Sequence, residues 1–496
     1  MTAPPGEKLQ SNAAASFVAV VGAATTTLAS FLVAFLVSQE SKGFAGAFFT
    51  STAVATIGGN SLALGTPTSL VYFMPQALTG GHPSPRGLIV QALRPVVVAS
   101  CLVGVVVALL APHFADLVSD QQVSEITTLV RTFAPAIPAW AITAALLGAT
   151  RGLGSMTPTV VVSQVLRPGA QIVFLGTLYL FGSPSALAVG LAWMLPVVIA
   201  MFAAVIAVVR LGGFHSDRHV VVASAAFWAY ARPRAIANSL QIALERVDVI
   251  FVQALLGGEA AGVYGALTRY IAAGNFLIFA VAQAVSVTLR RAIATQHLHR
   301  AGQILRQTTA WLMLAAWPYF LIVALKPEPL ADILNSEFVA DAGILSILAI
   351  GMMVSAAAGP IDLTLLMLGK SKISLAGIVI AITTDIALLV VLAPRYGLAG
   401  AASAWAISVI VQNLFASYFV RRTSGLTTMS AAWVRAAVLT VGATVPISLV
   451  TADSFRGLLV TGVVAAALLL IGVAFSRDTF GVGPPLNGRK DLEPSD

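Results

Sequence analysis

Ionisable side chains lie deep inside apolar stretches of this sequence, and their types and spacing could support chemistry. Glu245, Arg246 and Asp248 fall within an apolar run from 235 to 256. Glu245 lies 11 residues beyond Arg234, which is roughly 16 Å along a helix and near the middle of a bilayer. An ionisable group at that depth costs at least about 2.5–3.5 kcal/mol unless it is paired or hydrated, so we interpret these groups as lining a transport pathway.

Arg269 is the expected partner of these carboxylates. It lies in the next apolar run, 261–289, eight residues or roughly 12 Å from one end. Glu245 and Asp248 are three residues apart and share one helix face. Two interpretations stay open: the charges line a water-filled cavity, or they form a buried ion pair that locks two helices together.

Four further polar residues lie within apolar runs, namely Asp385, Asp362, Arg167 and Asn60. Asp385 falls near the middle of the run 373–393. For Asp362 and Arg167 the alternative is a side chain that extends to the membrane interface. For Asn60 the favoured interpretation is a hydrogen bond between helices.

Any coupling to an ion would fall on carboxylates, because all six histidines lie in loops or at expected interfaces. The candidates are Glu245, Asp248, Asp362 and Asp385. The sequence has no metal-ligand spacing, P-loop or nucleophile motif. We therefore expect no enzymatic activity and no cofactor, with transport driven by H⁺, Na⁺ or the membrane potential.

The composition shows which elements must position these charges. Apolar residues make up 58% of the 496 and charged residues only 10%, whereas soluble domains carry about 25% charged residues. Such a chain needs lipid as its solvent, which predicts an all-α polytopic membrane protein. The net charge of +8 is explained by basic cytoplasmic loops, so we expect no nucleic acid partner.

Fourteen apolar runs are long enough to cross a bilayer as helices. They are 14–37, 45–74, 88–111, 124–149, 158–181, 186–209, 235–256, 261–289, 304–325, 341–368, 373–393, 398–420, 432–451 and 455–475. Bends are expected at Pro67, Pro135, Pro138, Pro196 and Pro360.

The basic residues predict the orientation of these spans. With the N-terminus in the cytoplasm, 21 of the 28 lysines and arginines fall at the inner side and 5 at the outer side, while Arg246 and Arg269 lie within spans. This bias predicts that both termini are cytoplasmic. An even number of spans is consistent with it.

The spans group into parts of the chain. We expect an N-terminal six-helix repeat at 1–210, a cytoplasmic interfacial linker at 211–234 and a C-terminal six-helix repeat at 235–422. Two additional spans occupy 423–476, and a cytoplasmic tail occupies 477–496.

Short motifs recur in the same order in both repeats. KGFAGA at 42–47 is similar to AGVYGA at 261–266, and LAVGLAW at 187–193 is similar to LAGAASAW at 398–405. Because six is even, the two repeats enter the membrane from the same side, which predicts parallel repeats about an axis along the membrane normal.

Several turn motifs carry a family resemblance. They are RVD at 246–248, LGGEAAGVYGA at 256–266, GKSK at 369–372 and PRYGLAGAA at 394–402. Through them the first twelve spans resemble the Wzx-type polysaccharide flippases of the multidrug/oligosaccharidyl-lipid/polysaccharide exporter superfamily. These motifs bend the chain or allow close helix packing, so they indicate fold better than cargo.

The resemblance implies a V-shaped molecule in the bacterial cytoplasmic membrane, with a cationic cavity that faces each side in turn. It would move a polyprenyl-pyrophosphate-linked saccharide outward. Arg269, with Arg246 and Arg167, would hold the pyrophosphate, and Asn60 is a further candidate for substrate contact. The implied partners are this substrate, membrane lipids, a polysaccharide polymerase and other envelope-assembly proteins.

The sequence departs from two related branches. Lipid II flippases carry arginines in spans one and two, and drug exporters carry carboxylates in their first half; this chain has neither. The alternatives that remain open are a multidrug or lipid exporter of the same superfamily and a non-transporting scaffold for envelope assembly.

Overall fold

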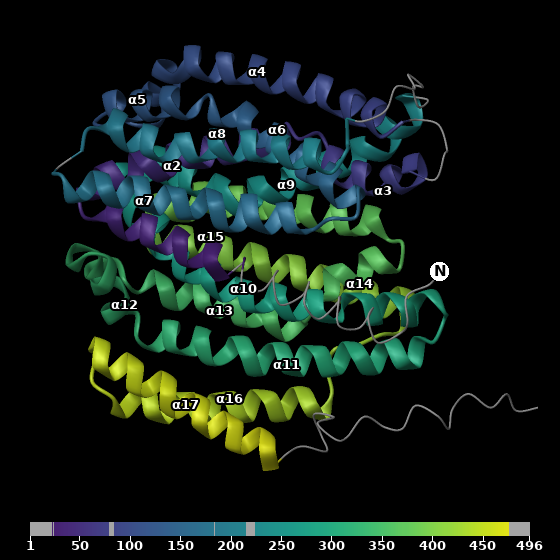
Figure 1. The fold of residues 1–496 in the computed structure, drawn as a ribbon. Coiled ribbons are helices and arrows are strands. Elements are labelled where there is room, and N and C mark those ends of the chain that lie inside the picture. Colours follow the sequence, from purple (N-terminus) through teal and green to yellow (C-terminus); the bar gives the residue numbers. More distant parts are fainter. Residues whose placement is uncertain (1–21, 23, 79–83, 183, 215–223, 476–496) are drawn as a thin grey trace, which may run out of the picture.

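The computed structural model describes residues 22, 24–78, 84–182, 184–214 and 224–475, and every regular element in these ranges is a helix (Figure 1). The expected all-α fold class is confirmed. Long helices run roughly side by side, from α4 at the top of Figure 1 to α16 and α17 at the bottom. The first 21 residues, including the start of the first expected span, lie outside the described part.

The described helices make fourteen passages when broken pairs count as one and the longest helix counts as two. In chain order they are Ala24–Ser38; α2 (Lys42–Ser61) with α3 (Thr66–Leu78); α4 (Pro85–Val118); α5 (Val123–Phe133) with α6 (Ala136–Gly152); η1 (Thr159–Leu166) with α7 (Arg167–Leu180); α8 (Ala186–Arg210); α9 (Ser224–Leu256); α10 (Gly258–Ala294); α11 (Leu298–Leu325); α13 (Ile344–Ala358) with α14 (Ile361–Met367); the two parts of α15 (Ser371–Ser424); α16 (Ala431–Val450); and α17 (Phe455–Phe475). Two short helices, α12 (Pro327–Leu334) and η2 (Ser336–Asp341), follow α11.

Length and hydropathy alone identify fewer spans. Within the described residues, eight helices are long and apolar enough to cross a membrane, or nine when α13 and α14 count as one bent span. One of the eight is α15, which reverses into a second passage at Gly397, where φ is 59°. The passages left out are the short helix Ala24–Ser38, the broken α2–α3 pair, α9 and α10.

Two passages are interrupted by glycine. Between α2 and α3 the chain turns through Leu64 and Gly65, with φ of 52° and 69°, earlier than the expected bend at Pro67. A Cβ on Gly65 would collide with the carbonyl of Ala231 in α9. The α13–α14 pair bends by 41° near Pro360, as the sequence predicts.

The start of α9 differs from the expected interfacial linker. The helix begins at Ser224 and continues through Pro233 into the seventh passage. Tyr230 stacks on Tyr72 of α3 with ring centroids 4.4 Å apart, and Phe227 lies 5.7 Å from Phe73. Aromatic packing on α3 therefore makes the last part of the expected linker a continuation of the seventh helix.

Small residues join the two halves where α2 meets α10. A Cβ on Gly46 would meet the carbonyl of Gly258, and one on Gly262 would meet the carbonyl of Lys42. Because these glycines lack side chains, the two backbones can touch. We call this region, at the starts of α2 and α10, the closed end.

Hydrogen bonds reinforce the closed end. The Thr50 hydroxyl lies 3.3 Å from the Gln253 side-chain oxygen. Nearby, Gln39 donates to the Leu334 carbonyl and Asn335 donates to the Ser38 carbonyl, both at 2.7 Å. These contacts hold the first helix and α12 at the same end of the molecule.

The last two helices pack on α11, and a lysine at the end of α11 forms hydrogen bonds to the turn between them. Lys326, at the end of α11, is only 4% exposed. Its ammonium group donates to the carbonyl of Thr451 at 2.6 Å and to the carboxylate of Asp453 at 2.5 Å. Both acceptors lie in the turn between α16 and α17, so this turn is fixed to the core.

Candidate functional site

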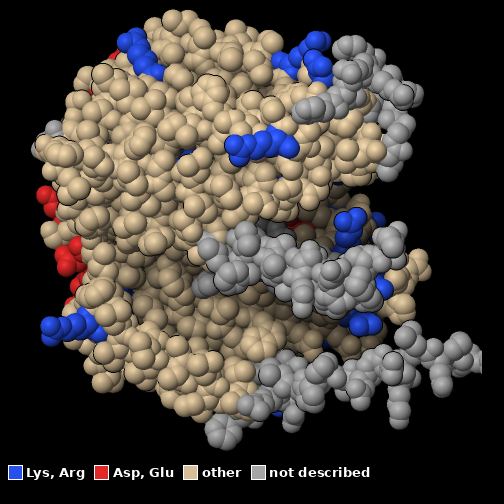
Figure 2. Space-filling view, in the orientation of Figure 1, with Lys and Arg blue, Asp and Glu red and all other residues tan. Residues whose placement is uncertain are grey.

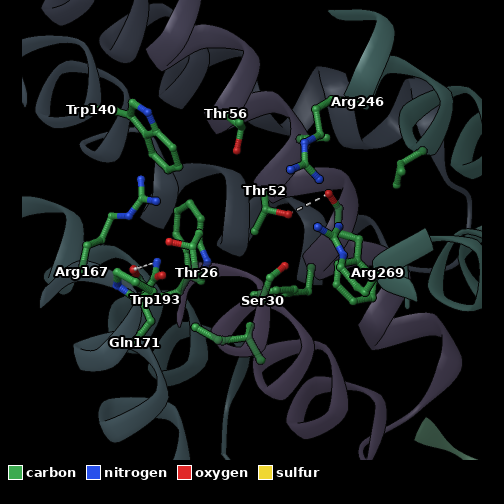
Figure 3. A pocket seen from close by; sticks show the side chains of 17 residues that line it. Thr26, Ser30, Thr52, Thr56, Trp140, Arg167, Gln171, Trp193, Arg246 and Arg269 are labelled. Carbon is green, nitrogen blue, oxygen red and sulfur yellow. Dashed lines mark hydrogen bonds between the residues drawn. The ribbon is translucent and has the colours of Figure 1, made fainter. Parts of the chain in front are cut away.

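A cavity of about 210 Å³ lies between the two halves. Its walls come from the first helix and α2, from α6, α7 and α8 of the first half, and from α9 and α10 of the second. Figure 3 shows guanidinium, hydroxyl and indole groups directed into it. The polar and aromatic lining residues labelled there are Thr26, Ser30, Thr52, Thr56, Trp140, Arg167, Gln171, Trp193, Arg246 and Arg269.

Arg246 and Arg269 form one side of the cavity (Figure 3). The Arg269 Nε donates to the carbonyl of Gly265 one helical turn earlier at 3.1 Å, and its guanidinium lies 5.1 Å from the ring centroid of Phe49. Among the described residues the ion pairs within 4 Å are Lys42–Glu337 and Lys326–Asp453, both outside the cavity. Arg269 is therefore not in an ion pair with the carboxylates of α9.

Arg167 reaches the cavity from the opposite side (Figure 3). The π-helical turn η1 leads into α7, and Arg167 is the first residue of α7. Its guanidinium lies 4.3 Å from the ring centroid of Trp140 on α6. The Arg167 Nε is buried and has no hydrogen-bond partner among the described residues, so this group can donate to a ligand.

Hydroxyl groups line the remaining wall. Thr26 and Ser30 lie four residues apart on the first helix, and Thr52 and Thr56 lie four apart on α2. Residues at this spacing share a helix face. Thr52 uses its proton within its own helix, donating to the carbonyl of Phe49 at 2.9 Å, and still has lone pairs that can accept.

This polar stripe was not predicted, although the four-residue spacing in the first two spans was a readable signal. Trp140 and Trp193, whose rings stack with centroids 6.3 Å apart, were not predicted either. No local pattern distinguishes these tryptophans from aromatic residues that pack in the core.

Two buried carboxylates lie in the second half, on α9 and α15. Asp248 is 4% exposed and accepts hydrogen bonds from its neighbour's backbone N–H at 2.8 Å and from the Tyr264 hydroxyl at 2.9 Å. Asp385 on α15 is fully buried, and neither of its oxygens has a partner. Asp248 and Asp385 interact electrostatically, so two acids and a phenol form one buried cluster.

A smaller cavity of about 120 Å³ adjoins this cluster. It is lined by Glu245 and Asp248 and shares Arg246 and Arg269 with the central cavity. Charges of both signs therefore meet here without direct ion pairs. Among the described residues, no group of three or more histidine, cysteine or acidic side chains could hold a metal ion.

Besides Asp248 and Asp385, three further expected site residues lie outside the lining of the central cavity. Asn60 donates to the carbonyl of Thr56 in its own helix at 2.9 Å. Glu245 is exposed and accepts from Gln241 at 3.2 Å. Asp362 on α14 accepts from Ser374 at 2.7 Å. The structure thus brings the three arginines together in one cavity and leaves these residues outside it.

The central cavity has a consistent electrostatic character. Its lining contains three arginines and no acidic residue. Guanidinium groups bind phosphate and carboxylate through planar, paired donors. The arrangement is suited to hold an anion together with a hydroxyl-rich group, and the lining offers no nucleophile with an adjacent base.

Comparisons with known proteins agree with this architecture. Residues 233–391 match the MatE family model. In structure the chain is similar to "Lipid II flippase MurJ, inward closed conformation", with TM-score 0.76 and 13% identity over 94% of this chain and 99% of that one. Comparison with curated protein sequences gave no match.

Drug transporters are similar over a smaller part of the chain. An inward-facing multidrug resistance MATE transporter of the MOP superfamily gives TM-score 0.67 and 14% identity, over 81% of this chain and 94% of that one. The MATE transporter DinF-BH in complex with R6G gives 0.64 and 17%, over 83% and 94%. The chain therefore has the same multi-pass helical fold as these solved transporters.

Proposed function

We propose that this protein moves a polyprenyl-pyrophosphate-linked saccharide from the inner to the outer leaflet of a bacterial cytoplasmic membrane. The observation that carries the proposal is the convergence of Arg167, Arg246 and Arg269 on one cavity whose lining has no acidic residue. A buried charge without a partner is costly. Three partly buried guanidinium groups that share one cavity and have no ion pair among the described residues are best explained by an anionic ligand that neutralises them.

The hydroxyl and indole groups of the cavity support the saccharide part of the ligand. Trp140 and Trp193 offer flat apolar faces, while Thr26, Ser30 and Gln171 offer hydrogen-bonding groups. Such a lining is typical of sites that combine apolar contact with a few polar anchors. Exposed apolar side chains on helices such as α4 provide the surface for lipid tails.

The closed end supports alternating access. It lies where the charge bias predicts the outer side, so the central cavity would face the cytoplasm in this conformation. Figure 2 shows a recess at the right-hand end, between the upper and lower helices, with basic side chains near its mouth. Opening the closed end and closing the recess would carry the substrate outward.

The Asp248–Tyr264–Asp385 cluster is the proposed coupling site. The unpartnered Asp385 oxygens could bind H⁺ or Na⁺. Because Arg246 and Arg269 line both the central cavity and the cavity beside Asp248, an ion there would change the field at the substrate site. An ion gradient could drive transport in this way.

The competing function is export of a drug or lipid by the same fold. An exporter of cationic drugs would need carboxylates in the central cavity. The lining contains three arginines and no acidic residue, which disfavours this alternative. The three arginines would also suit export of an anionic lipid. Flipping of a lipid-linked saccharide and export of an anionic lipid are distinguished by whether transport requires a saccharide on the cargo.

The proposal can be tested in cells that lack the native gene and express variants of the protein, by measuring surface polysaccharide, lipid-linked saccharide and protein level. Arg269→Ala should abolish surface polysaccharide and accumulate lipid-linked saccharide inside, at a normal protein level. Arg269→Lys should retain part of the activity, because it keeps the charge but loses the paired donors. Arg210→Ala, at the exposed end of α8, is the matched control. Normal polysaccharide export by Arg269→Ala would overturn the site assignment.

A further inference from the structure

A second cavity, of about 180 Å³, lies inside the first half. Its walls come from α6, η1, α7 and α8 and the start of α3. Its polar lining consists of Thr143, Arg151, Thr159, Ser163 and Arg167. We call it the Arg151 cavity, after the residue that distinguishes it from the central cavity.

Two of its polar groups lack hydrogen-bond partners among the described residues, while Thr143 and Ser163 donate to carbonyls of their own helices. The Arg167 Nε and the Thr159 hydroxyl are buried and form no hydrogen bond. Arg151 donates its Nε to the Leu147 carbonyl at 3.3 Å and has no carboxylate within 4 Å. No acidic residue lines the cavity.

Leaving such a site empty is unfavourable in free energy. Buried donors without acceptors each cost about 1–3 kcal/mol, and more when they are charged. Two guanidinium groups and the unpartnered Thr159 hydroxyl line the same cavity and match the acceptor oxygens of a phosphate group. The purely apolar part of the wall, which includes Pro67 and Val197, limits the volume to a small polar group.

We propose that the Arg151 cavity binds a phosphate or pyrophosphate group. In transport it would hold the phosphate of the substrate before the substrate enters the central cavity. Arg151 lies in the last turn of α6, at the end expected to face the cytoplasm. Arg167 and Trp140 line both cavities. An anion can therefore pass from Arg151 to Arg167 and on to the central site while it stays in contact with a guanidinium. This holding role rests on the proposed function, whereas the binding of phosphate does not.

Pyrophosphate binding to the purified full-length protein in nanodiscs tests the site. Titration with inorganic pyrophosphate, read by tryptophan fluorescence and calorimetry, uses an Arg269→Ala background that weakens the central site. In this background Arg151→Gln should weaken the remaining binding by about tenfold or more, since a charge-assisted pair of hydrogen bonds is lost. Arg210→Gln, with the same charge change at the same end, should leave it unchanged.

A second variant keeps the test sharp if Arg151→Gln folds poorly. Thr159→Val removes only a hydroxyl without a protein partner and should weaken binding by a smaller factor at unchanged thermal stability. Pyrophosphate binding that is the same in Arg151→Gln, Thr159→Val and Arg210→Gln would overturn the site.

Nanodiscs with and without a polyprenyl phosphate lipid distinguish the two sources of phosphate. Competition between this lipid and pyrophosphate, lost in Arg151→Gln, supports the holding role. Pyrophosphate binding that the lipid does not displace assigns the site to a soluble anion and overturns that role. Failure of the native protein to move a polyprenyl-pyrophosphate-linked saccharide would refute the proposed function but leave Arg151-dependent pyrophosphate binding unaffected, so the two failures are distinguishable.

Discussion

Substituting Gly262 with alanine should favour the conformation in which the closed end opens. The new methyl group would collide with the carbonyl of Lys42 and lie 3.0 Å from the backbone nitrogen of Gly46. These atoms are backbone, so relief requires α2 and α10 to separate. Overpacking of this kind costs about 1–3 kcal/mol. If the methyl group destabilises only the closed conformation, the ratio of open to closed molecules rises by about 5- to 150-fold.

Thiol accessibility measures this shift. With Cys101→Ser removing the only cysteine, Ser30→Cys places a thiol in the central cavity. A membrane-impermeant maleimide added from outside should label this thiol slowly in the parent and at least several-fold faster with Gly262→Ala.

Gly442→Ala is the matched control, because a Cβ at Gly442 meets no heavy atom within 4 Å. It should leave the labelling rate unchanged. Equal outside labelling of the Gly262→Ala and Gly442→Ala proteins would refute the reasoning, since the closed end would then not limit access.

Three further substitutions probe other contacts. Lys326→Met removes the bonds to the α16–α17 turn and should cost about 1–3 kcal/mol, seen as a lower midpoint of thermal unfolding; Arg210→Met should show no such loss. Tyr264→Phe removes the donor to Asp248 and should change the H⁺ or Na⁺ concentration at half-maximal transport in proteoliposomes; an unchanged ion dependence contradicts the coupling site. Trp140→Leu removes a cation–π contact worth about 0.5–2 kcal/mol and should raise the substrate concentration at half-maximal transport; an unchanged value would show that the guanidinium does not need the ring.

Much of the fold could be predicted because lipid imposes strict rules on sequence. Helices must satisfy their own backbone hydrogen bonds, so long apolar runs revealed the passages, and Pro360 correctly marked a bend. The break at Leu64 and Gly65 was not predicted, because it depends on how closely α9 approaches. The same holds for the start of α9, which tertiary aromatic contacts extend.

The arginines of the cavity could be singled out from sequence because a charge at membrane depth is rare and costly. Their meeting in one cavity could not be derived from spacing, since Arg167 lies on a different half from Arg246 and Arg269. The Arg151 cavity was also invisible, because Arg151 alone is an ordinary basic residue at a helix end. Its meaning comes from the unpartnered groups that the fold places beside it.

Flipping in proteoliposomes tests the central claim most directly. The substrate is a polyprenyl-pyrophosphate-linked saccharide that carries a fluorophore. A membrane-impermeant reducing agent destroys the fluorophores in the outer leaflet, so the loss of fluorescence reports the fraction of lipid moved between leaflets. We expect rapid movement by the native protein, the rate of protein-free liposomes for Arg269→Ala, and no movement of an uncharged polyprenyl glycoside. Equal movement of the uncharged lipid, or a native rate no higher than that of protein-free liposomes, would contradict the central claim.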